Sequence, residues 1–378
     1  MRIGYDAKDF FKKFSKFGSY KQCIIKEMEK HFPDNQYLLY TSDAKHSKDI
    51  LDVQNYTNIE IRTPAKIISR MNMGNLWRST ILGNTALNDK VDVFHGLSNE
   101  LPIIISKKLK TVVTIHDLFF IRYPKLYQPL EIEIIKRRIK HACQIANKII
   151  AINNQTAEDI HSFLGISKNK IEVIYPGCDQ CFNIEHDLFE LKKVIDLYNL
   201  PPDFILHLPP FESASGTISL LRALASIEAK IDCPLIIVEH PARSYKKEIM
   251  KEAVLLGISE RIIFLQQIPS DDLSKIYQLS KLFVYTATYE GSALPIIQAL
   301  NARVPVITSP GFEKVGGKGA MYVKNKDVEA LGETIVKILL NTQLASKMIS
   351  GGELHVKQFS NENLANQLFE VYKSVINN

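Results

Sequence analysis

The stretch LFVYTATYEGSALPIIQAL at residues 282–300 decides the fold of the second half of the chain, and VPVIT follows at residues 304–308. Leu282–Tyr285 is a short apolar run typical of a buried strand. A polar turn with small residues comes next, and the apolar segment Pro295–Leu300 predicts a short helix. Such a turn presents backbone N–H groups and the positive end of a helix to an anion. The pattern predicts a parallel α/β sheet with an anion-binding turn.

Length and composition bound the class of protein. The chain has 378 residues, which fits two domains better than one core, and 46% apolar with 23% charged residues is typical of a soluble globular protein. The chain has no long uncharged apolar run, so we expect no transmembrane helix. Its first residues lack the apolar region that a signal peptide needs, so we expect no signal peptide. Five scattered cysteines indicate thiols, and no second ligand pair completes a metal site with Cys178 and Cys181. We therefore expect a cytoplasmic protein without a bound metal.

Charge is uneven along the chain. Residues 1–180 hold 27 basic and 19 acidic residues, a net charge of +8, whereas residues 181–378 hold 20 and 22, a net charge of −2. A basic first half fits an anionic membrane face or a phosphorylated acceptor, or it is a lysine-rich solvated surface. Basic patches interleaved with aromatic residues are absent, so we expect no nucleic-acid partner.

Apolar runs alternate with amphipathic runs along the chain, which predicts βαβ units and parallel sheets. Tyr175-Pro176-Gly177 ends a first series, and Pro201-Pro202 precedes a second. We expect an α/β domain over 1–182, a linker over 183–203, an α/β domain over 204–360 and a last helix over 361–378. The expected strands are 1–5, 37–40, 59–62, 91–94, 110–115, 148–152, 170–174, 204–208, 235–238, 261–264, 282–285 and 305–307. The expected helices are 21–31, 131–146, 218–227, 243–255, 270–278, 295–300 and 328–339, and we expect the charged connector 188–200 to be helical.

Two common nucleotide motifs are missing. No G-x-G-x-x-G follows an expected strand, and no G-x-x-x-x-G-K-[ST] occurs in the chain. Nicotinamide and P-loop chemistry therefore fit the sequence poorly.

The segment Tyr289–Leu300 resembles the nucleotide-sugar binding motif of glycosyltransferase family 4, a retaining group with the GT-B fold. The family motif usually has two glutamates and a glycine-rich turn; here Glu290 and Gln298 hold the glutamate positions, and Ala293 stands at the usual second glycine. The resemblance runs from Met1 to about Tyr372. It implies two doubly wound, Rossmann-like domains with parallel sheets that face across a cleft, the first on the acceptor side and the second binding the nucleotide-sugar, with the last helix returning to the first domain.

The resemblance also implies donor contacts in the second domain. Glu290 would contact the donor sugar, and Gln298 would meet the ribose, where a glutamine still accepts a hydrogen bond through its carbonyl oxygen. The other interpretation of Glu290 is a carboxylate favoured by a helix start. The turn residues that would offer N–H groups to the diphosphate are Gly291, Ser292, Ala293 and Leu294.

In the first domain, Thr114-Ile115-His116-Asp117 ends an expected strand, and the resemblance places His116 near the donor sugar. His95 and Asn99 follow the strand before it and match the family's acceptor-side segment; the alternative is a loop held by local hydrogen bonds. Gly18 matches a glycine that lets the backbone approach the donor phosphates ahead of a helix N-terminus. A simple loop glycine is the other interpretation of Gly18.

The phosphate site departs from the family pattern. The family usually has a basic pair after the first strand of the second domain, and by spacing Ala214 and Ser215 occupy those positions. Glu239 stands where a glycine turn usually follows the next strand, near the expected phosphate. Losing two charge-assisted hydrogen bonds costs roughly 3–6 kcal/mol of leaving-group stabilisation. Arg243 is the nearby cation that would compensate.

Two functions remain open on these residues. The first is a retaining, metal-independent hexosyltransferase that uses a UDP- or GDP-sugar as substrate, without another cofactor, and a saccharide or lipid-linked acceptor in polysaccharide assembly. It would act in the cytoplasm, at the inner membrane face. The second is a catalytically inactive relative that binds and stabilises an active partner transferase.

Overall fold

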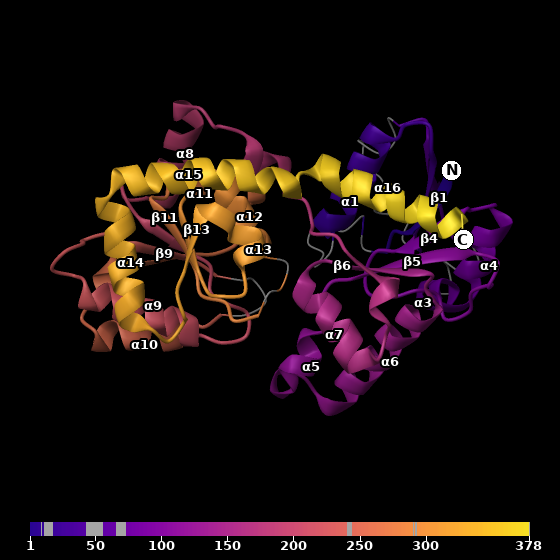
Figure 1. The fold of residues 1–378 in the computed structure, drawn as a ribbon, viewed down its shortest axis with the longest axis horizontal. Helices are drawn as coiled ribbons and strands as arrows, with labels where there is room; N and C mark the ends of the chain where they lie inside the picture. Colours follow the sequence, from indigo (N-terminus) through magenta and orange to yellow (C-terminus); the bar gives the residue numbers. More distant parts are fainter. Residues whose placement is uncertain are drawn as a thin grey trace. The chain divides into compact units, whose positions relative to one another are not determined.

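A computed structural model of the chain describes residues 1–8, 10, 18–42, 56–65, 73–239, 244–289, 291 and 293–377. It divides into two compact units, the first formed by Met1–Gly177 with Asn361–Asn378 and the second by Cys178–Ser360 (Figure 1). The first unit ends before residue 182 because the 3-10 segment η6 (Gln180–Asn183) packs on α11 (Ser270–Leu279) of the second unit.

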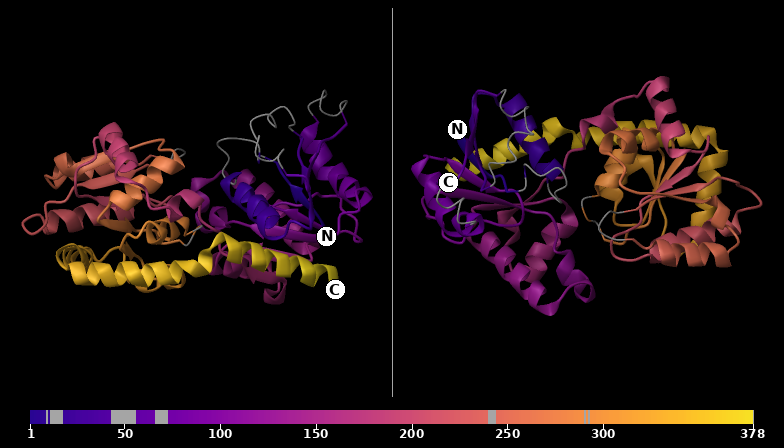
Figure 2. Two further views of the ribbon diagram at one scale, coloured as in Figure 1. Left: turned by 90° about the horizontal axis from the view of Figure 1, so that it is seen from above. Right: turned by 180° about the vertical axis from the view of Figure 1, so that it is seen from behind.

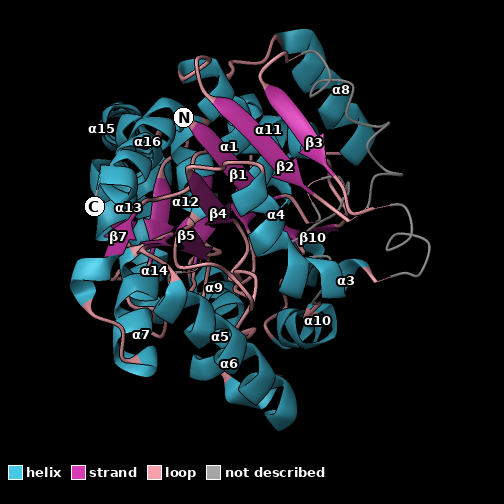
Figure 3. Cartoon of the chain, turned by 90° about the vertical axis from the view of Figure 1, so that its right-hand side faces the viewer, coloured by secondary structure: helices cyan, strands magenta, loops and turns pink. Residues whose placement is uncertain are grey.

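The first unit contains a seven-stranded parallel sheet in the order β3-β2-β1-β4-β5-β6-β7, part of which is seen in Figure 3. Its central strands are almost wholly buried because helices cover both faces of a parallel sheet. The strands are β1 (Arg2–Asp6), β2 (Gln36–Tyr40), β3 (Ile59–Arg62), β4 (Val93–Gly96), β5 (Lys110–Ile115), β6 (Lys148–Ala151) and β7 (Ile171–Val173). The helices described are α1 (Gly18–His31), α3 (Gly74–Leu76), η3 (Trp77–Ile81), α4 (Leu82–Asn88), α5 (Phe119–Arg122), η4 (Pro124–Leu126), α6 (Pro129–Ile145), α7 (Asn154–Leu164), η5 (Lys168–Lys170) and α16 (Asn361–Asn377).

Helix α16 belongs to the first unit although it ends the chain. It lies beside α1 and packs against β4 and β5 (Figures 1 and 2). Leu364, Leu368 and Tyr372 recur every four residues, so they share one helix face, and all three are buried in the core with residues of β1 and α1. An apolar face on the last helix thus completes the core of the first unit.

The second unit contains a six-stranded parallel sheet in the order β10-β9-β8-β11-β12-β13. The strands are β8 (Ile205–His207), β9 (Leu235–Val238), β10 (Ile262–Leu265), β11 (Leu282–Tyr285), β12 (Val306–Thr308) and β13 (Ala320–Tyr322). The other helices are α8 (Leu188–Tyr198), α9 (Ser215–Ser226), α10 (Lys246–Leu255), η7 (Ser259–Arg261), α12 (Leu294–Asn301), α13 (Glu313–Gly316), η8 (Gly317–Gly319), α14 (Val328–Leu340), α15 (Thr342–Val356) and η9 (Lys357–Phe359).

The predicted class of two parallel α/β domains is confirmed, and the expected strands agree with the observed ones to within two residues. The expected linker contains α8, which packs on α11. β13, α7, α15 and the helical segment 74–88 were not predicted from the sequence. Within the described residues, no helix is long and apolar enough to cross a membrane.

Candidate functional site

The carboxyl edge of the first sheet carries polar residues from neighbouring strands. Asp6 ends β1, His95 lies near the end of β4, His116 follows β5 and Asn153 follows β6. The strands run parallel, and chain order reverses between β1 and β4, so this edge is a topological switch point of the kind where α/β sheets bind ligands.

His116 and Asn99 are brought together at this edge. The backbone N–H of His116 donates to Asn99 Oδ1 at 2.7 Å, and His116 Nε2 donates to the carbonyl oxygen of Leu97 at 2.9 Å. Asn99 has a φ of 64°, a left-handed conformation that asparagine tolerates. The ring of Tyr20, from α1, packs edge-on against the imidazole of His116, with 4.8 Å between the ring centroids. Asn99 therefore fixes the loop that orients His116.

His95 lies elsewhere, in the core. It is fully buried; Tyr372 Oη lies 2.7 Å from Nδ1 and Thr114 Oγ1 lies 2.8 Å from Nε2. Burial, with a smaller contribution from His116, lowers the pKa of His95 to about 3, so the ring is neutral. The predicted contact of His95 with the acceptor saccharide is incompatible with this burial, because no part of the side chain reaches a surface. His95 instead joins α16 to the sheet.

Arg78 links two carboxylates at the same edge, an arrangement that was not predicted from the sequence. Its Nε donates to Asp6 Oδ2 at 2.6 Å and its Nη1 to Glu100 Oε2 at 2.7 Å. Burial opposes the charged form of Arg78, but the two carboxylates outweigh it and raise its pKa. Two carboxylates could have predicted a cation at this edge: Glu100, directly after Asn99, and Asp6, which ends β1.

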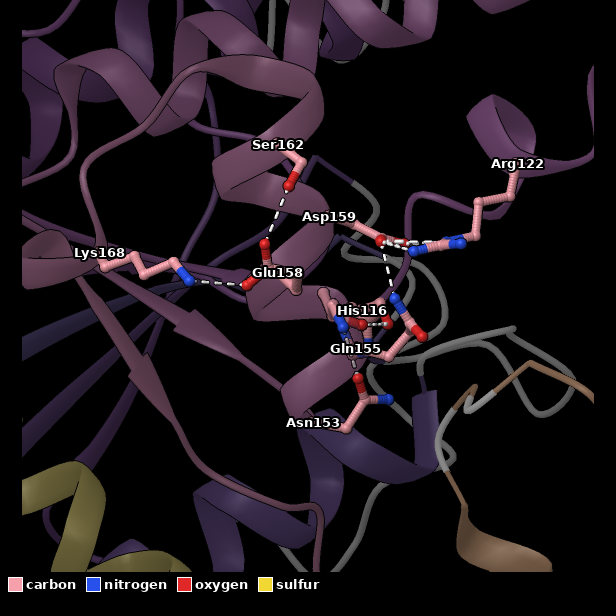
Figure 4. A network of polar contacts seen from close by, with 9 residues as sticks. His116, Arg122, Asn153, Gln155, Glu158, Asp159, Ser162 and Lys168 are labelled. Atoms are coloured by element: carbon pink, nitrogen blue, oxygen red, sulfur yellow. Dashed lines mark hydrogen bonds and ion pairs between the residues drawn. The ribbon is translucent and has the colours of Figure 1, made fainter. Parts of the chain in front are cut away.

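A second polar network lies behind His116 (Figure 4). Asn153 caps α7 by accepting the N–H of Thr156 at 2.6 Å, and the hydroxyl of Thr156 donates to the carbonyl oxygen of His116 at 3.3 Å. Arg122 donates to both oxygens of the fully buried Asp159. The cap of α7 thereby holds the backbone of His116 in place.

In the second unit, the first turn of α9 packs closely on the end of β11. A Cβ on Gly216 would lie 2.4 Å from Thr286 Oγ1 and 2.6 Å from Thr286 O, so glycine is required for this approach. His207, at the end of β8, has ring nitrogens 2.8 Å from Thr217 Oγ1 and 2.7 Å from Val284 O, and burial lowers its pKa to about 4. β8 and β11 are the strands between which chain order reverses in this sheet.

A hydrogen bond joins the loops that lead into α9 and α12. Glu212 Oε1, before α9, accepts from the backbone N–H of Thr288 at 2.7 Å and from its hydroxyl at 3.0 Å. Thr286 Oγ1 is buried without a hydrogen-bond partner among the described residues. This edge therefore combines two linked helix-start loops with a hydroxyl that lacks a partner.

Ala214 and Ser215, at the positions of the family's basic pair, carry no charge. Ala214 is buried, and Ser215 Oγ lies 2.8 Å from Ser213 Oγ. Glu239 is buried at the end of β9, where its partners come from the residues before α10 and after β10: Ser244 Oγ donates to Oε1 at 2.5 Å and Gln266 Nε2 to Oε2. Two neutral side chains thus hold the Glu239 carboxylate at the end of β9.

The turn before α12 is described only in part. Ala293 precedes the helix with a φ of 51°, in the left-handed region that the family's glycine adopts without strain. Leu294 begins α12, and Gln298 is half-buried within it. Gly291 donates its N–H to Tyr289 O at 2.9 Å. Gly18 begins α1 in the first unit. The predicted contacts Glu290, Ser292 and Arg243 lie outside the described residues.

Two family models match the two halves of the chain. The model described as Glycosyltransferase Family 4 matches residues 37–180, and the model described as Glycosyl transferases group 1 matches residues 190–355. The chain belongs to the family 4 type of glycosyltransferases. It is therefore an enzyme of the glycosyltransferase class.

Similar proteins agree with this assignment. The O-antigen chain mannosyltransferase B of Escherichia coli is 25% identical over 295 residues, which cover 76% of each chain. A glycosyltransferase structure from Rickettsia africae has a TM-score of 0.73 at 19% identity and covers 100% of this glycosyltransferase and 99% of that chain. An Anabaena protein solved with UDP, Alr3699/HepE, has a TM-score of 0.69 at 18% identity, with coverage of 99% and 100%. The fold is thus GT-B. No group of three or more His, Cys, Asp or Glu side chains among the described residues could hold a metal ion.

Proposed function

We propose that this glycosyltransferase moves a hexose, with retention of configuration, from a nucleoside diphosphate sugar to a saccharide or lipid-linked saccharide during assembly of a surface polysaccharide. The observation that carries the proposal is the second-unit edge, where Gly216 packs on Thr286 and Glu212 bonds Thr288. These contacts draw the start of α9 toward the turn before α12. Two helix starts offer amides and positive dipole ends to one diphosphate.

The proposed chemistry follows from charge on the leaving group. Breaking the bond between sugar and phosphate leaves negative charge on the diphosphate, and amides already fixed in place stabilise it without reorganisation. The amides of Gly216 and Thr217 lie in the first turn of α9 and have no acceptor within the helix. With neutral residues at 214 and 215, Arg243 remains the proposed cation. The resemblance gives Glu290 and His116 the contacts with the transferred sugar.

Mannose is the first sugar to test, because the similar Escherichia coli protein is a mannosyltransferase. The purified protein would be incubated with GDP-mannose, or with UDP-glucose, and a mannoside acceptor. Proton NMR of the new anomeric signal is expected to show the configuration of the donor. A product of opposite configuration would contradict retention, and no product with either donor would contradict the proposed donor class.

We also propose that the first unit docks on an anionic membrane. Ile103 and Ile104 are 59% and 52% exposed, and both backbone N–H groups donate to Ser79 O in η3. Ile81, also exposed, ends η3, so these side chains come from adjoining segments. Helix α6 lies close to Ile103, since His141 Nε2 is 3.4 Å from Ile103 O. The exposed cations that follow Ile104 in sequence or lie on α6 include Lys107, Lys108, Arg137 and Lys140. Apolar side chains beside cations suit an anionic lipid surface.

Sedimentation with lipid vesicles tests the docking proposal. Replacing Lys107 and Lys108 by alanine is expected to weaken binding to phosphatidylglycerol vesicles about 30-fold, since each lysine contributes about 1 kcal/mol near such a surface. The same change at Lys192 and Lys193, exposed on α8 of the second unit, serves as control and leaves binding unchanged. Equal binding to phosphatidylcholine vesicles would contradict an electrostatic docking surface.

A further inference from the structure

Glu239 directly follows β9, which is the second strand of the second sheet in chain order. With β8 as the first strand, the order β10-β9-β8-β11-β12-β13 is 3-2-1-4-5-6, the order of dinucleotide-binding sheets. In those sheets the phosphates lie at the helix start after strand one, and an acidic residue near the end of strand two accepts hydrogen bonds from a ribose hydroxyl. Here α9 follows β8, and Glu239 directly follows β9. Topology therefore puts a carboxylate where a nucleotide's ribose lies relative to its phosphates.

The sheet register shows how far Glu239 reaches along this edge. Ile237 pairs with His207, the last residue of β8, so Glu239 lies two residues further toward the carboxyl edge. Its backbone N–H donates to Leu265 O at 3.0 Å, which keeps the end of β9 in the ladder with β10. The residue is thus held by the sheet and does not belong to a loose loop.

The carboxylate of Glu239 has spare acceptor capacity. Ser244 and Gln266 each donate one hydrogen bond, one to each oxygen, and both donors are neutral. An ionised carboxylate has about four lone-pair sites, so roughly one remains on each oxygen. No Lys or Arg among the described residues forms an ion pair with Glu239. A buried carboxylate in this state gains from two further O–H donors.

The ribose contact of the family is altered at the same time. The glutamate that usually meets the ribose is Gln298 here, and this half-buried amide makes no side-chain hydrogen bond among the described residues. An amide oxygen forms weaker hydrogen bonds with hydroxyls than a carboxylate does. The acidic acceptor that α12 lacks is present at the end of β9.

We propose that Glu239 binds the 2′- and 3′-hydroxyls of the donor nucleotide, held for this task by Ser244 and Gln266. The proposal rests on the nucleotide-sugar donor proposed above and adds how the ribose is recognised. Two adjacent hydroxyls match two carboxylate oxygens, whereas a phosphate at this place would be repelled. Glu239 therefore selects a ribonucleotide over its deoxy form.

Calorimetric titration with GDP and 2′-deoxy-GDP, and with UDP and 2′-deoxy-UDP, tests this selection. We expect the wild-type protein to bind the ribonucleotide at least 10-fold more tightly, as loss of a hydrogen bond to a charged group implies. Glu239→Gln should reduce that preference to less than about threefold. Glu260→Gln is the matched control, since Glu260 is exposed in η7 before β10, at the opposite edge, and should keep the wild-type preference.

The outcomes separate this inference from the function on which it rests. Nucleotide binding with an unchanged ribose preference in Glu239→Gln would overturn the role of Glu239 and leave the donor proposal standing. Binding of none of the four nucleotides by folded wild-type protein would overturn both. If Glu239→Gln does not fold, Glu239→Asp, which keeps the charge but withdraws it by one methylene, should show the reduced preference; full preference in that variant would overturn the proposal.

Discussion

Gly216→Ala is expected to destabilise the second unit and to weaken nucleotide binding by more than tenfold. The added Cβ would lie 2.4 Å from a side-chain oxygen and 2.6 Å from the backbone oxygen of Thr286. Rotation of the threonine relieves only the first clash, so the start of α9 must move away from β11. Forced displacement of this kind costs roughly 1–3 kcal/mol of folding free energy. It would also misplace the amides proposed to hold the diphosphate.

Gly332→Ala is the matched control for this variant. Gly332 also lies in a helix, α14, but the nearest atoms to its Cβ are the side-chain atoms Ile227 Cγ2 at 3.0 Å and Ser226 Oγ at 3.3 Å. Thermal unfolding and calorimetry with GDP and UDP would be compared for the two variants. We expect the control to bind as the wild type does. Unchanged binding by Gly216→Ala would show that the start of α9 is not part of the donor site.

Arg78→Ala is expected to reduce the stability of the first unit by about 3–5 kcal/mol, the usual cost of leaving a buried charge without its partner. The side chain of Asp6 is 2% exposed and that of Arg78 13%, so the carboxylate of Asp6 is almost fully shielded from water and relies on the guanidinium. Glu100 loses a hydrogen bond at the same time.

Arg222→Ala provides the comparison, because Arg222 also pairs with a glutamate but its side chain is 54% exposed. An exposed pair contributes at most about 1 kcal/mol. Urea unfolding followed by circular dichroism would measure both variants. Similar losses in the two variants would mean that the triad of Arg78, Asp6 and Glu100 is not stabilising through burial.

Regular strands were predictable because parallel sheets require short apolar runs at regular intervals, and β5 and β9 were located to the residue. Helix α15 was missed because Gly351 and Gly352 argue against a helix interior. The structure explains them: a Cβ on Gly352 would lie 2.9 Å from Leu300 Cδ2, and one on Gly351 would lie 2.8 Å from Lys318 Cβ. Close packing decided these positions, and propensity cannot reveal it.

The candidate site was predictable only where position along a strand carries the information. His116 and Asn99 lie together because both follow adjacent strands of one sheet. The burial of His95 was not predictable, because it depends on Tyr372, which lies 277 residues away in sequence. The partner of Asp6 was equally remote, since Arg78 comes from a helical segment that was not predicted from the sequence.

Titration of the wild-type protein with GDP and UDP tests most directly the central claim, that the edge between β8 and β11 is a working donor site. We expect one of the two to bind with a dissociation constant of micromolar order, and Glu290→Ala to weaken that binding. A folded sample that binds neither nucleotide would contradict the claim, and the neutral residues at 214 and 215 would then mark a site that no longer binds a donor.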